Sequence, residues 1–412
     1  MSIVATAIMF VFAGTMQGYE ISADHKIVRV DPTTGIGGEV LLDVRGPKRL
    51  NVNYAWETTR GQLDTAGERA ALTQLSSGWA LVTVSAFDSI SGELLGRHSV
   101  PIFAWRWFYC ILADDLYGKS WTWARFMTYM RENQIPHGVG LITGNIDESQ
   151  TWWTDELRDY IHLPFVEAYN HGWLHTCAEW MSSEEDQIAT VAQTNEKAER
   201  LFGVNYLGWV PPGNCWNEHT TSALLKSGIR WASSRPHDFP RNVPGMAYFF
   251  QYGGIEGGDS RIGDVSLDYF KLIYMSRREN TSVVAGFVHP NHVGDTENDW
   301  SEFLKVLEFI RLEQITLIRP SDFLTLFWEG VAPIDPRGDE DADGLNNYIE
   351  GRGDTDGDGA PDFLDSDSDF EIGGLADYAA ILPPAQVGIG KISVVMVAAL
   401  VILVPFFMED IR

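Results

Sequence analysis

The stretch FYCILADD, residues 108–115, is an apolar run that ends in two acids, and it opens a new pattern in the chain. Helical spacing follows in WTWARFMTYMREN (121–133), and a second strand-like run follows in GVGLITG (138–144). The same alternation of strands and helices continues over about 105–330. Such an alternation predicts an α/β fold built on a parallel sheet or barrel.

Two later segments extend this alternation. The capping box Ser182-x-x-Glu185 predicts the start of a helix that runs to about Phe202. VVAGFVHP (283–290) reads as a further buried strand. In parallel α/β folds the catalytic residues lie at the carboxyl ends of the strands, so reactive side chains are expected at those ends.

Four predicted strands are each followed by residue types that carry chemistry. A lone Asp-Asp is commonly a solvated turn, and a lone His-x-x-x-His is commonly two unrelated histidines. Four such strand ends in order are difficult to reach by chance and indicate one site. These residues are Asp114 and Asp115, His171 and His175, Pro211 to Gly213, and His289.

These segments resemble the ordered motifs of polysaccharide deacetylases. CILADD, NHGWLH, WVPPGN and FVHP are similar to the motifs of the NodB-homology domain of carbohydrate esterase family 4. The most specific stretch is EAYNHGWLH (167–175), close to the family pattern Glu-x-x-Asn-His-x-x-x-His. The resemblance covers about 105–330, and it implies a distorted (β/α) barrel that removes acetyl groups from N-acetylated glycans.

The resemblance also implies roles for individual residues. Asp115, His171 and His175 would hold zinc or another divalent transition metal, and Asp114 would be the general base. Three nitrogen and oxygen ligands leave a position open for water, as catalytic zinc requires. The metal lowers the pKa of that water, which attacks the amide carbonyl once Asp114 takes its proton. His289, as an imidazolium, would protonate the leaving amine.

The motif around Pro212 and Gly213 departs from the family pattern. A backbone N–H near Gly213 is expected to stabilise the oxyanion. However, Val210 occupies the position where the family usually has an arginine that tunes the base, and Gly213 replaces a tyrosine. The stretch SSRPHDF (233–239) offers a substitute, with Asp238 where a later family motif falls.

These departures leave two other functions open. A barrel that has lost activity and binds glycan is favoured by the missing arginine and disfavoured by the retention of the five residues of the expected site. A related deacylase of an O-ester or a lipid-linked sugar would use the same metal and water. We expect His292 to be a solvated loop residue, and His219 and His237 have no assigned role.

Residues 19–104 have a different, all-β pattern. VLLDV (40–44), LNVNYAWET (50–58) and ALVTVSAFD (80–88) are strand-like and separated by Gly, Asp and Ser turns. The spacing predicts a small sandwich and resembles the immunoglobulin-like modules of bacterial and archaeal surface proteins. It carries no visible chemistry, so we interpret it as a spacer or binding module.

Acidic charge is concentrated in residues 335–371, which hold fourteen acids and two bases. DEDADGLNNYIE (339–350) matches the 12-residue calcium loop, and DTDGDGAPDFLD (354–365) repeats it, each with glycine at position 6. The alternative is an unstructured acidic linker. Two tandem matches favour calcium, and their spacing resembles thrombospondin type 3 or dockerin-like repeats. The predicted ligands are Asp339, Asp341, Asp343, Asn347, Glu350, Asp354, Asp356, Asp358, Asp362 and Asp365.

The whole chain has 57 acidic and 30 basic side chains and a net charge of −27. This balance argues against a nucleic-acid partner, which needs a basic footprint. Residues 1–18 are expected to be a signal peptide, with a buried strand as the alternative. Residues 387–408 are expected to be a transmembrane or sorting segment, with a buried helix as the alternative. We therefore expect an exported protein, tethered at the membrane or cell surface with its catalytic domain outside the cytoplasm.

The three cysteines show no Cys-x-x-Cys spacing, so a thiolate zinc knuckle is not expected. Cys110 lies in an apolar run and is expected to be a buried thiol. Cys177 and Cys215 can form a disulfide if the loops that carry them meet, and two free thiols are the alternative.

Overall fold

The structure is a computed structural model whose chain forms two compact units, Met1–Gly338 and Asp339–Arg412. Each unit is described by itself. Asp238, the predicted signal segment 1–18 and the predicted C-terminal segment 387–408 lie outside the described residues. Within the part of the chain that is described, no helix is long and apolar enough to cross a bilayer. The structure describes residues 19–47, 51–234, 243–250, 255–256, 264–277, 283–326, 331–335 and 338–366.

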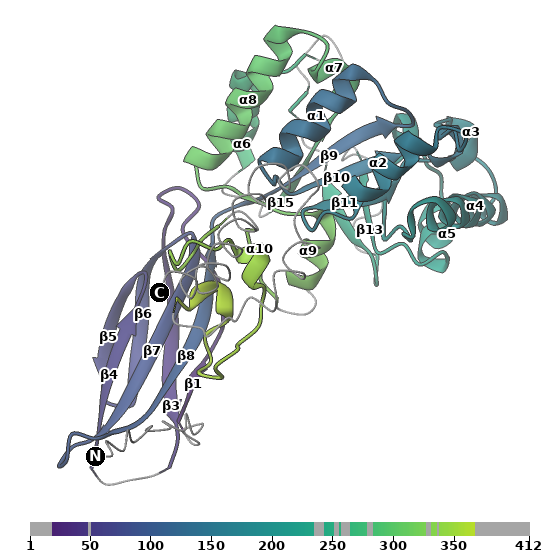
Figure 1. The fold of residues 1–412 in the computed structure, drawn as a ribbon. Coiled ribbons are helices and arrows are strands. Elements are labelled where there is room, and N and C mark those ends of the chain that lie inside the picture. Colours follow the sequence, from purple (N-terminus) through teal and green to yellow (C-terminus); the bar gives the residue numbers. More distant parts are fainter. Residues whose placement is uncertain are drawn as a thin grey trace, which may run out of the picture. The chain divides into compact units, whose positions relative to one another are not determined.

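Two four-stranded sheets form the first part of the larger unit (Figure 1). Val40, Leu72, Val82 and Ile102 are fully buried in one shared core. Two sheets packed on a common core form a β-sandwich, and its immunoglobulin-like character stays a prediction. The first sheet has the order β1 (Glu20–Ala23), β3 (Ile36–Arg45), β6 (Arg69–Ser76) and β5 (Gln62–Ala66), and the second has the order β2 (Ile27–Arg29), β8 (Leu94–Trp105), β7 (Gly78–Asp88) and β4 (Val52–Thr58).

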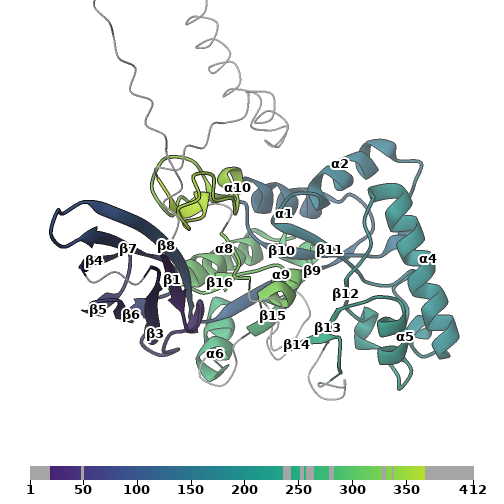
Figure 2. The same cartoon turned by 90° about the horizontal axis from the view of Figure 1, so that it is seen from below.

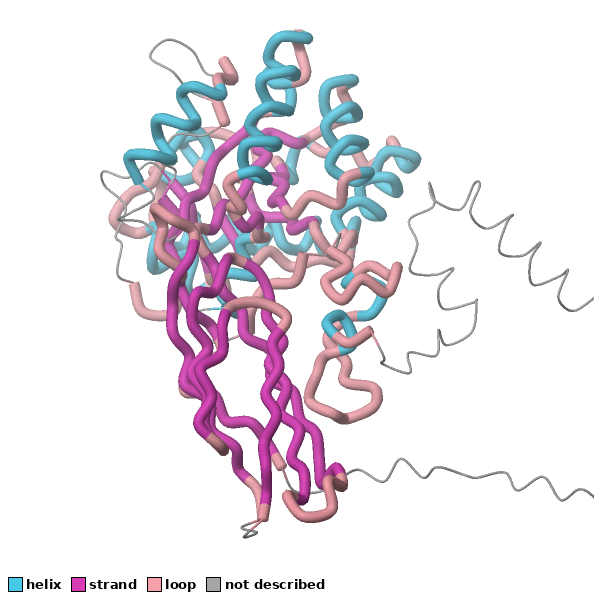
Figure 3. The backbone as a smooth tube through the Cα atoms, turned by 90° about the vertical axis from the view of Figure 1, so that its left-hand side faces the viewer, coloured by secondary structure: helices cyan, strands magenta, loops and turns pink. Residues whose placement is uncertain are grey.

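The second part is a curled parallel sheet, which confirms the predicted α/β class. Helices lie around the outside of its strands (Figures 2 and 3). The strand order is β14 (Ala247–Phe250), β13 (Trp231–Ser234), β12 (Gly208–Trp209), β11 (Val166–Asn170), β10 (His137–Leu141), β9 (Phe108–Leu116) and β15 (Val283–Val288), and β16 (Thr316–Leu317) also pairs with β9.

Apolar side chains of α1 (Trp121–Glu132) are buried in the core that also includes the strands of this sheet. The face of α1 that carries Trp123, Phe126 and Met130 is buried, and the side chain of Ser120 caps its first turn. The other helices are α2 (Thr151–Ile161), α3 (Cys177–Trp180), α4 (Glu184–Phe202), α5 (Thr220–Lys226), α6 (Leu267–Arg277), α7 (Pro290–Val293), α8 (Glu297–Leu312) and α9 (Pro320–Leu324), with short 3-10 turns η1 (Thr143–Asn145) and η2 (Pro212–Asn214).

Two local predictions were wrong in detail. The helix predicted to start at Ser182 is α4, and its cap is Ser183, whose side chain accepts a hydrogen bond from the backbone N–H of Asp186. The hydroxyl of Ser182 donates to the carbonyl of Glu179 at the end of α3. The strand that the sequence predicts directly before Pro211 to Gly213, in YLGWVPP (206–212), is reduced to the two residues of β12, because its prolines have no N–H to donate to a ladder.

Strand register aligns the carboxyl ends of the central strands. Ala113 of β9 pairs with Val288 of β15 and with Val139 of β10, and Leu141 of β10 pairs with Asn170 of β11. The residues that follow these pairs therefore meet at one edge of the sheet, as the alternating sequence pattern predicts.

The smaller unit is described over Asp339–Ser366 and consists mostly of turns. It contains one short helix, α10 (Asn347–Glu350), and one 3-10 turn, η4 (Asp362–Leu364). Asn346 caps α10 by accepting a hydrogen bond from the backbone N–H of Ile349.

Candidate metal centre and active site

Three predicted ligands converge at the carboxyl edge of the parallel sheet. Oδ1 of Asp115 lies 3.2 Å from Nε2 of His171 and 3.0 Å from Nε2 of His175. One ligand atom from each residue lies within 4.8 Å of the others. Burial raises the pKa of the Asp115 carboxyl, but His171 and His175 outweigh burial and lower it, so the carboxylate stays ionised.

A hydrogen bond to the backbone orients His171, and an unusual backbone conformation positions Asp115 and His175. Nδ1 of His171 donates to the carbonyl of Val210 at 2.9 Å, which leaves Nε2 free to act as a ligand. Asp115 and His175 both have left-handed backbones, with φ values of 70° and 62°. Such conformations are strained for residues with a side chain, and they cluster at functional sites.

Asp114 is buried beside the ligands with an exposed fraction of 4%. Its Oδ1 accepts a hydrogen bond from the hydroxyl of Tyr169, which lies on β11. Burial and the adjacent Asp114 raise the pKa of Tyr169 well above its ordinary value, so this hydroxyl keeps its proton. A Cβ at Gly140 would lie 2.7 Å from the Tyr169 ring, so the tyrosine fits only because glycine occupies that position. Tyr169 thus contacts Asp114, the proposed base whose pKa the family's arginine, replaced here by Val210, would tune.

His289 follows β15 and lies on the other side of Asp115, with Nε2 3.8 Å from Oδ2 of Asp115. Its Nδ1 donates to Oε2 of Glu256 at 2.8 Å, and its backbone N–H donates to Oε1 of the same carboxylate. Glu256 is completely buried. Burial lowers the pKa of His289, but Glu256 and the two aspartates reverse this effect and raise it to about 9. This raised pKa favours the imidazolium form of His289 at neutral pH.

The five residues surround one cavity of about 240 Å³. Gly213 lines the cavity as predicted, but Pro212 is not among the lining residues and packs beside Gly172. His292 is exposed, as predicted, but it belongs to the short helix α7 rather than to a loop, and it lines the same cavity. The cavity lining is Asp114, Asp115, His171, His175, Val210, Pro211, Gly213, Asn214, Phe287, His289 and His292.

Sequence reasoning missed Tyr169 and Glu256. Tyr169 lies inside the quoted motif EAYNHGWLH but was given no role. Glu256 lies 33 residues before His289 and forms an isolated bridge with Val265, outside the strand and helix pattern. The one available signal for Tyr169 was a pair of alternate glycines, Gly138 and Gly140, in an otherwise apolar strand.

The smaller unit contains two further carboxylate clusters. Oxygens of Asp339, Asp341 and Asp343 lie within 4.8 Å of one another, and those of Asp354, Asp356 and Asp358 do the same. The same hydrogen bonds recur within each loop: for example, the first aspartate accepts a hydrogen bond at 3.2 Å from the glycine N–H at position 6. Gly344 and Gly359 have left-handed φ values of 96° and 94°, as the sharp turn of a calcium loop requires.

Glu350, at position 12 of the first loop, has an exposed fraction of 5%. Among the described residues, neither of its carboxylate oxygens has a hydrogen-bond partner. Burial, together with the charges of Asp341, Asp343 and Asp339, raises its pKa to about 7. The position 9 side chains have other partners: Asn347 accepts from the N–H of Glu340, and Asp362 accepts from Thr355.

A family model matches the part of the chain that contains the three predicted metal ligands. Residues 110–232 match the model of the family described as "Polysaccharide deacetylase". This match covers less than half of the chain, and it includes Asp114, Asp115 and both histidines of the ligand set. It supports the predicted polysaccharide deacetylase domain, and thus a hydrolase that acts on carbon–nitrogen or ester bonds. No curated protein matches the chain.

Solved structures with similar folds include three from bacteria. A presumed polysaccharide deacetylase from Mycobacterium smegmatis has 14% identity and a TM-score of 0.45, covering 55% of this chain and 92% of that one. A family 4 acetyl xylan esterase from Clostridium thermocellum, in complex with cobalt, has 10% identity and a TM-score of 0.37, covering 55% and 93%. A family 4 carbohydrate esterase from Streptomyces lividans, in complex with acetate, has 13% identity and a TM-score of 0.37, covering 52% and 93%. These values are too low to carry an argument about function.

Proposed function

We propose that this chain is a metal-dependent hydrolase that removes acetyl groups from an N-acetylated glycan. The observation that carries the proposal is the convergence of Asp115, His171 and His175, whose ligand atoms lie within 4.8 Å of one another, with Asp114 and His289 lining the same cavity. A metal, a base and an acid at one edge are the groups that amide hydrolysis needs.

The donor set fits a divalent transition metal. Two imidazole nitrogens and one carboxylate oxygen are the ligands that zinc accepts in catalytic sites, where a further position stays open. Nδ1 of His171 is engaged with the Val210 carbonyl, so its Nε2 is the atom available for the metal. When bound, the metal would supply Lewis acidity and a lowered pKa for a coordinated water.

The protein residues divide the proton transfers between them. Asp114 is proposed to accept the proton of the attacking water, with the Tyr169 hydroxyl holding its carboxylate in place. His289 is proposed to give a proton to the leaving amine, and Glu256 keeps that imidazole charged and oriented. The backbone around Gly213 is proposed to face the developing oxyanion.

The alternative is a domain that binds glycan without catalysis. Val210 in place of the family arginine favours this alternative, because the base lacks its usual partner. The Tyr169 contact on Asp114 favours catalysis, because another side chain supports the same carboxylate. An O-acyl or lipid-linked sugar is a second substrate class that the same residues could serve.

We also propose that the smaller unit binds two calcium ions. Glu350 supports this proposal, since a buried carboxylate without a hydrogen-bond partner needs a cation or a proton. Calcium prefers six to eight oxygen ligands, which a carboxylate-rich loop supplies. Such ions are abundant outside cells, so the repeats agree with the expected export and cell-surface tethering, which rest on the sequence of the two ends.

A metal-content experiment tests the catalytic site. Wild type, His171→Ala, His175→Ala and His292→Ala are loaded with zinc, and bound zinc is measured after dialysis. We expect about one zinc per wild-type chain at this site, its loss in the first two variants, and its retention in His292→Ala. Zinc retention in His171→Ala and His175→Ala would contradict the ligand assignment.

A further inference from the structure

The loop between β11 and α3, residues 171–176, carries both histidines of the proposed metal site. Two of its residues have left-handed backbones, His175 with φ 62° and Gly172 with φ 88°. For a histidine, which has a Cβ, this conformation is strained. It persists only where the surroundings impose it. The contacts that impose this conformation on His175 come from residues that are not metal ligands.

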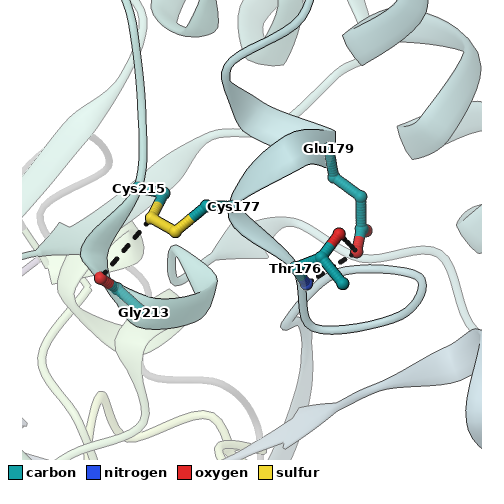
Figure 4. Close-up of a disulfide and its surroundings, with 5 residues drawn as sticks. All are labelled: Thr176, Cys177, Glu179, Gly213 and Cys215. Carbon is teal, nitrogen blue, oxygen red and sulfur yellow. Dashed lines mark hydrogen bonds between the residues drawn. A yellow bond between two sulfur atoms is a disulfide. The ribbon is translucent and has the colours of Figure 1, made fainter.

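The carboxylate of Glu179 accepts hydrogen bonds from backbone N–H groups on both sides of His175. Oε2 of Glu179 accepts a hydrogen bond from the N–H of Trp173 at 2.6 Å, and Oε1 accepts from the N–H of Leu174 at 3.0 Å. Oε1 also accepts from the N–H of Thr176 at 2.9 Å and from its hydroxyl at 3.0 Å (Figure 4). Hydrogen bonds to a charged acceptor are the stronger kind, so four of them fix the loop firmly.

A disulfide anchors the following residue to the other side of the cavity. Cys177 is bonded to Cys215, which confirms one of the two alternatives left open by the sequence. Cys215 directly follows η2, and its sulfur contacts the carbonyl of Gly213 (Figure 4). The histidine loop also packs closely on η2, since a Cβ at Gly172 would lie 2.7 Å from the Pro212 ring.

His171 is held by different contacts. Its backbone N–H donates to the carbonyl of Leu141 at 3.1 Å, and its Nδ1 donates to Val210. Both partners belong to the sheet edge rather than to α3. The contacts of Glu179 and of the disulfide therefore act on the half of the loop that carries His175.

We propose that Glu179 is a positioning residue that sets His175 as a metal ligand, and that the Cys177–Cys215 disulfide supports the same half of the loop. This inference rests on the proposed metal site. It predicts that the loss of Glu179 weakens metal binding through His175 alone. A general loss of folding would weaken binding through every ligand.

The test is a double-mutant cycle read out by zinc affinity, measured calorimetrically on the full chain without substrate. We expect Glu179→Ala to weaken zinc binding at least tenfold, and Cys177→Ser/Cys215→Ser to weaken it by a smaller factor. His175→Ala should lose zinc on dialysis but still bind it weakly through Asp115 and His171, so that background is titrated at higher zinc concentrations. There we expect no further weakening from Glu179→Ala, because the residue that it positions is already gone. Glu196→Ala, at an exposed position on α4, is the matched control and should leave zinc affinity unchanged.

Two results would overturn the inference. One is an unchanged zinc affinity in Glu179→Ala when wild type binds zinc tightly. The other is equal weakening by Glu179→Ala in the wild-type and His175→Ala backgrounds, which indicates a general structural effect. The milder Glu179→Gln, which keeps one carbonyl acceptor, covers the case in which the alanine variant does not fold. Failure of wild type to bind zinc contradicts the proposed function itself and is thus a distinct outcome.

Discussion

Glu256 accepts two hydrogen bonds from His289, one from the backbone N–H and one from Nδ1 at 2.8 Å. The carboxylate has no exposed surface, and the imidazole lies between it and Asp115. This arrangement directs Nε2 of His289 toward the cavity and favours the protonated ring. It explains how a histidine at the end of β15 can serve as an acid near neutral pH.

Replacing Glu256 should therefore move the alkaline limb of the pH–activity profile. In the proposed mechanism activity needs the imidazolium, so activity should be lost as the pH rises through the pKa of His289, which is about 9. Glu256→Gln removes a charge that raises this pKa, so the limb should move to lower pH by about one unit or more. The measurement is kcat against pH on an acetylated chitooligosaccharide.

Glu297→Gln is the matched control. Glu297 is an exposed carboxylate at the start of α8 that pairs with Arg125 of α1 instead of with His289. Its alkaline limb should coincide with that of wild type. An unchanged limb in Glu256→Gln would show that Glu256 does not control the protonation of His289.

Tyr169→Phe should lower kcat about tenfold and leave KM and bound zinc unchanged. The variant removes only the hydroxyl that donates to Asp114, and a hydrogen bond to a charged group is worth about 1.5–3 kcal/mol. The comparison variant is Tyr206→Phe, which removes a buried hydroxyl bonded to Thr143 instead. Equal effects of the two variants on kcat would show that the hydroxyl of Tyr169 has no specific role at Asp114.

The strand ends allowed most of this site to be predicted from the sequence. Asp114, Asp115 and His289 directly follow or end apolar runs, and parallel register brings such positions together. Glu256 could not be predicted in this way, because its position depends on chain outside the regular elements. The contact between Tyr169 and Asp114 could not be predicted either. It crosses β10 at glycines that make room for the Tyr169 ring, and this packing is visible only in the folded structure.

Local chemistry also limited the fold prediction. Ser182 and Ser183 are both capable caps, and only the tertiary contact of Ser182 with the end of α3 decides between them. The cysteine pair was likewise open until the loops that carry Cys177 and Cys215 were seen to meet.

Glu350→Gln should remove one of the two proposed calcium ions. Glu350 is the position 12 carboxylate of the first loop, and the second loop has its own acids. Calcium titration of the full chain should give a stoichiometry of about two for wild type and about one for the variant. Glu340→Gln, at the non-ligand position 2, should retain both ions.

Removal of calcium by a chelator should also raise protease sensitivity between residues 335 and 370. A cleavage pattern that does not depend on calcium would count against the sites.

Calcium affinity should fall as the pH is lowered through about 7. In the metal-free unit the pKa of Glu350 is raised to about 7, so below this pH a calcium ion must displace a proton from it. Burial of the carboxylate thus makes the proton and the ion competitors. Calorimetric titrations between about pH 6 and pH 8 should show this decline in wild type and a smaller one in Glu350→Gln. A flat affinity over this range in wild type would mean that Glu350 is not a ligand.

Acetate release by the zinc-loaded protein tests the central claim most directly. Chitooligosaccharides and peptidoglycan fragments are incubated with wild type and with Asp114→Asn, and free acetate is quantified. We expect release by wild type, and a loss of at least a hundredfold in Asp114→Asn with zinc still bound, because the variant keeps all three ligands but lacks the base. A wild-type protein that binds zinc and releases no acetate from any acylated glycan would contradict the account and favour a glycan-binding domain.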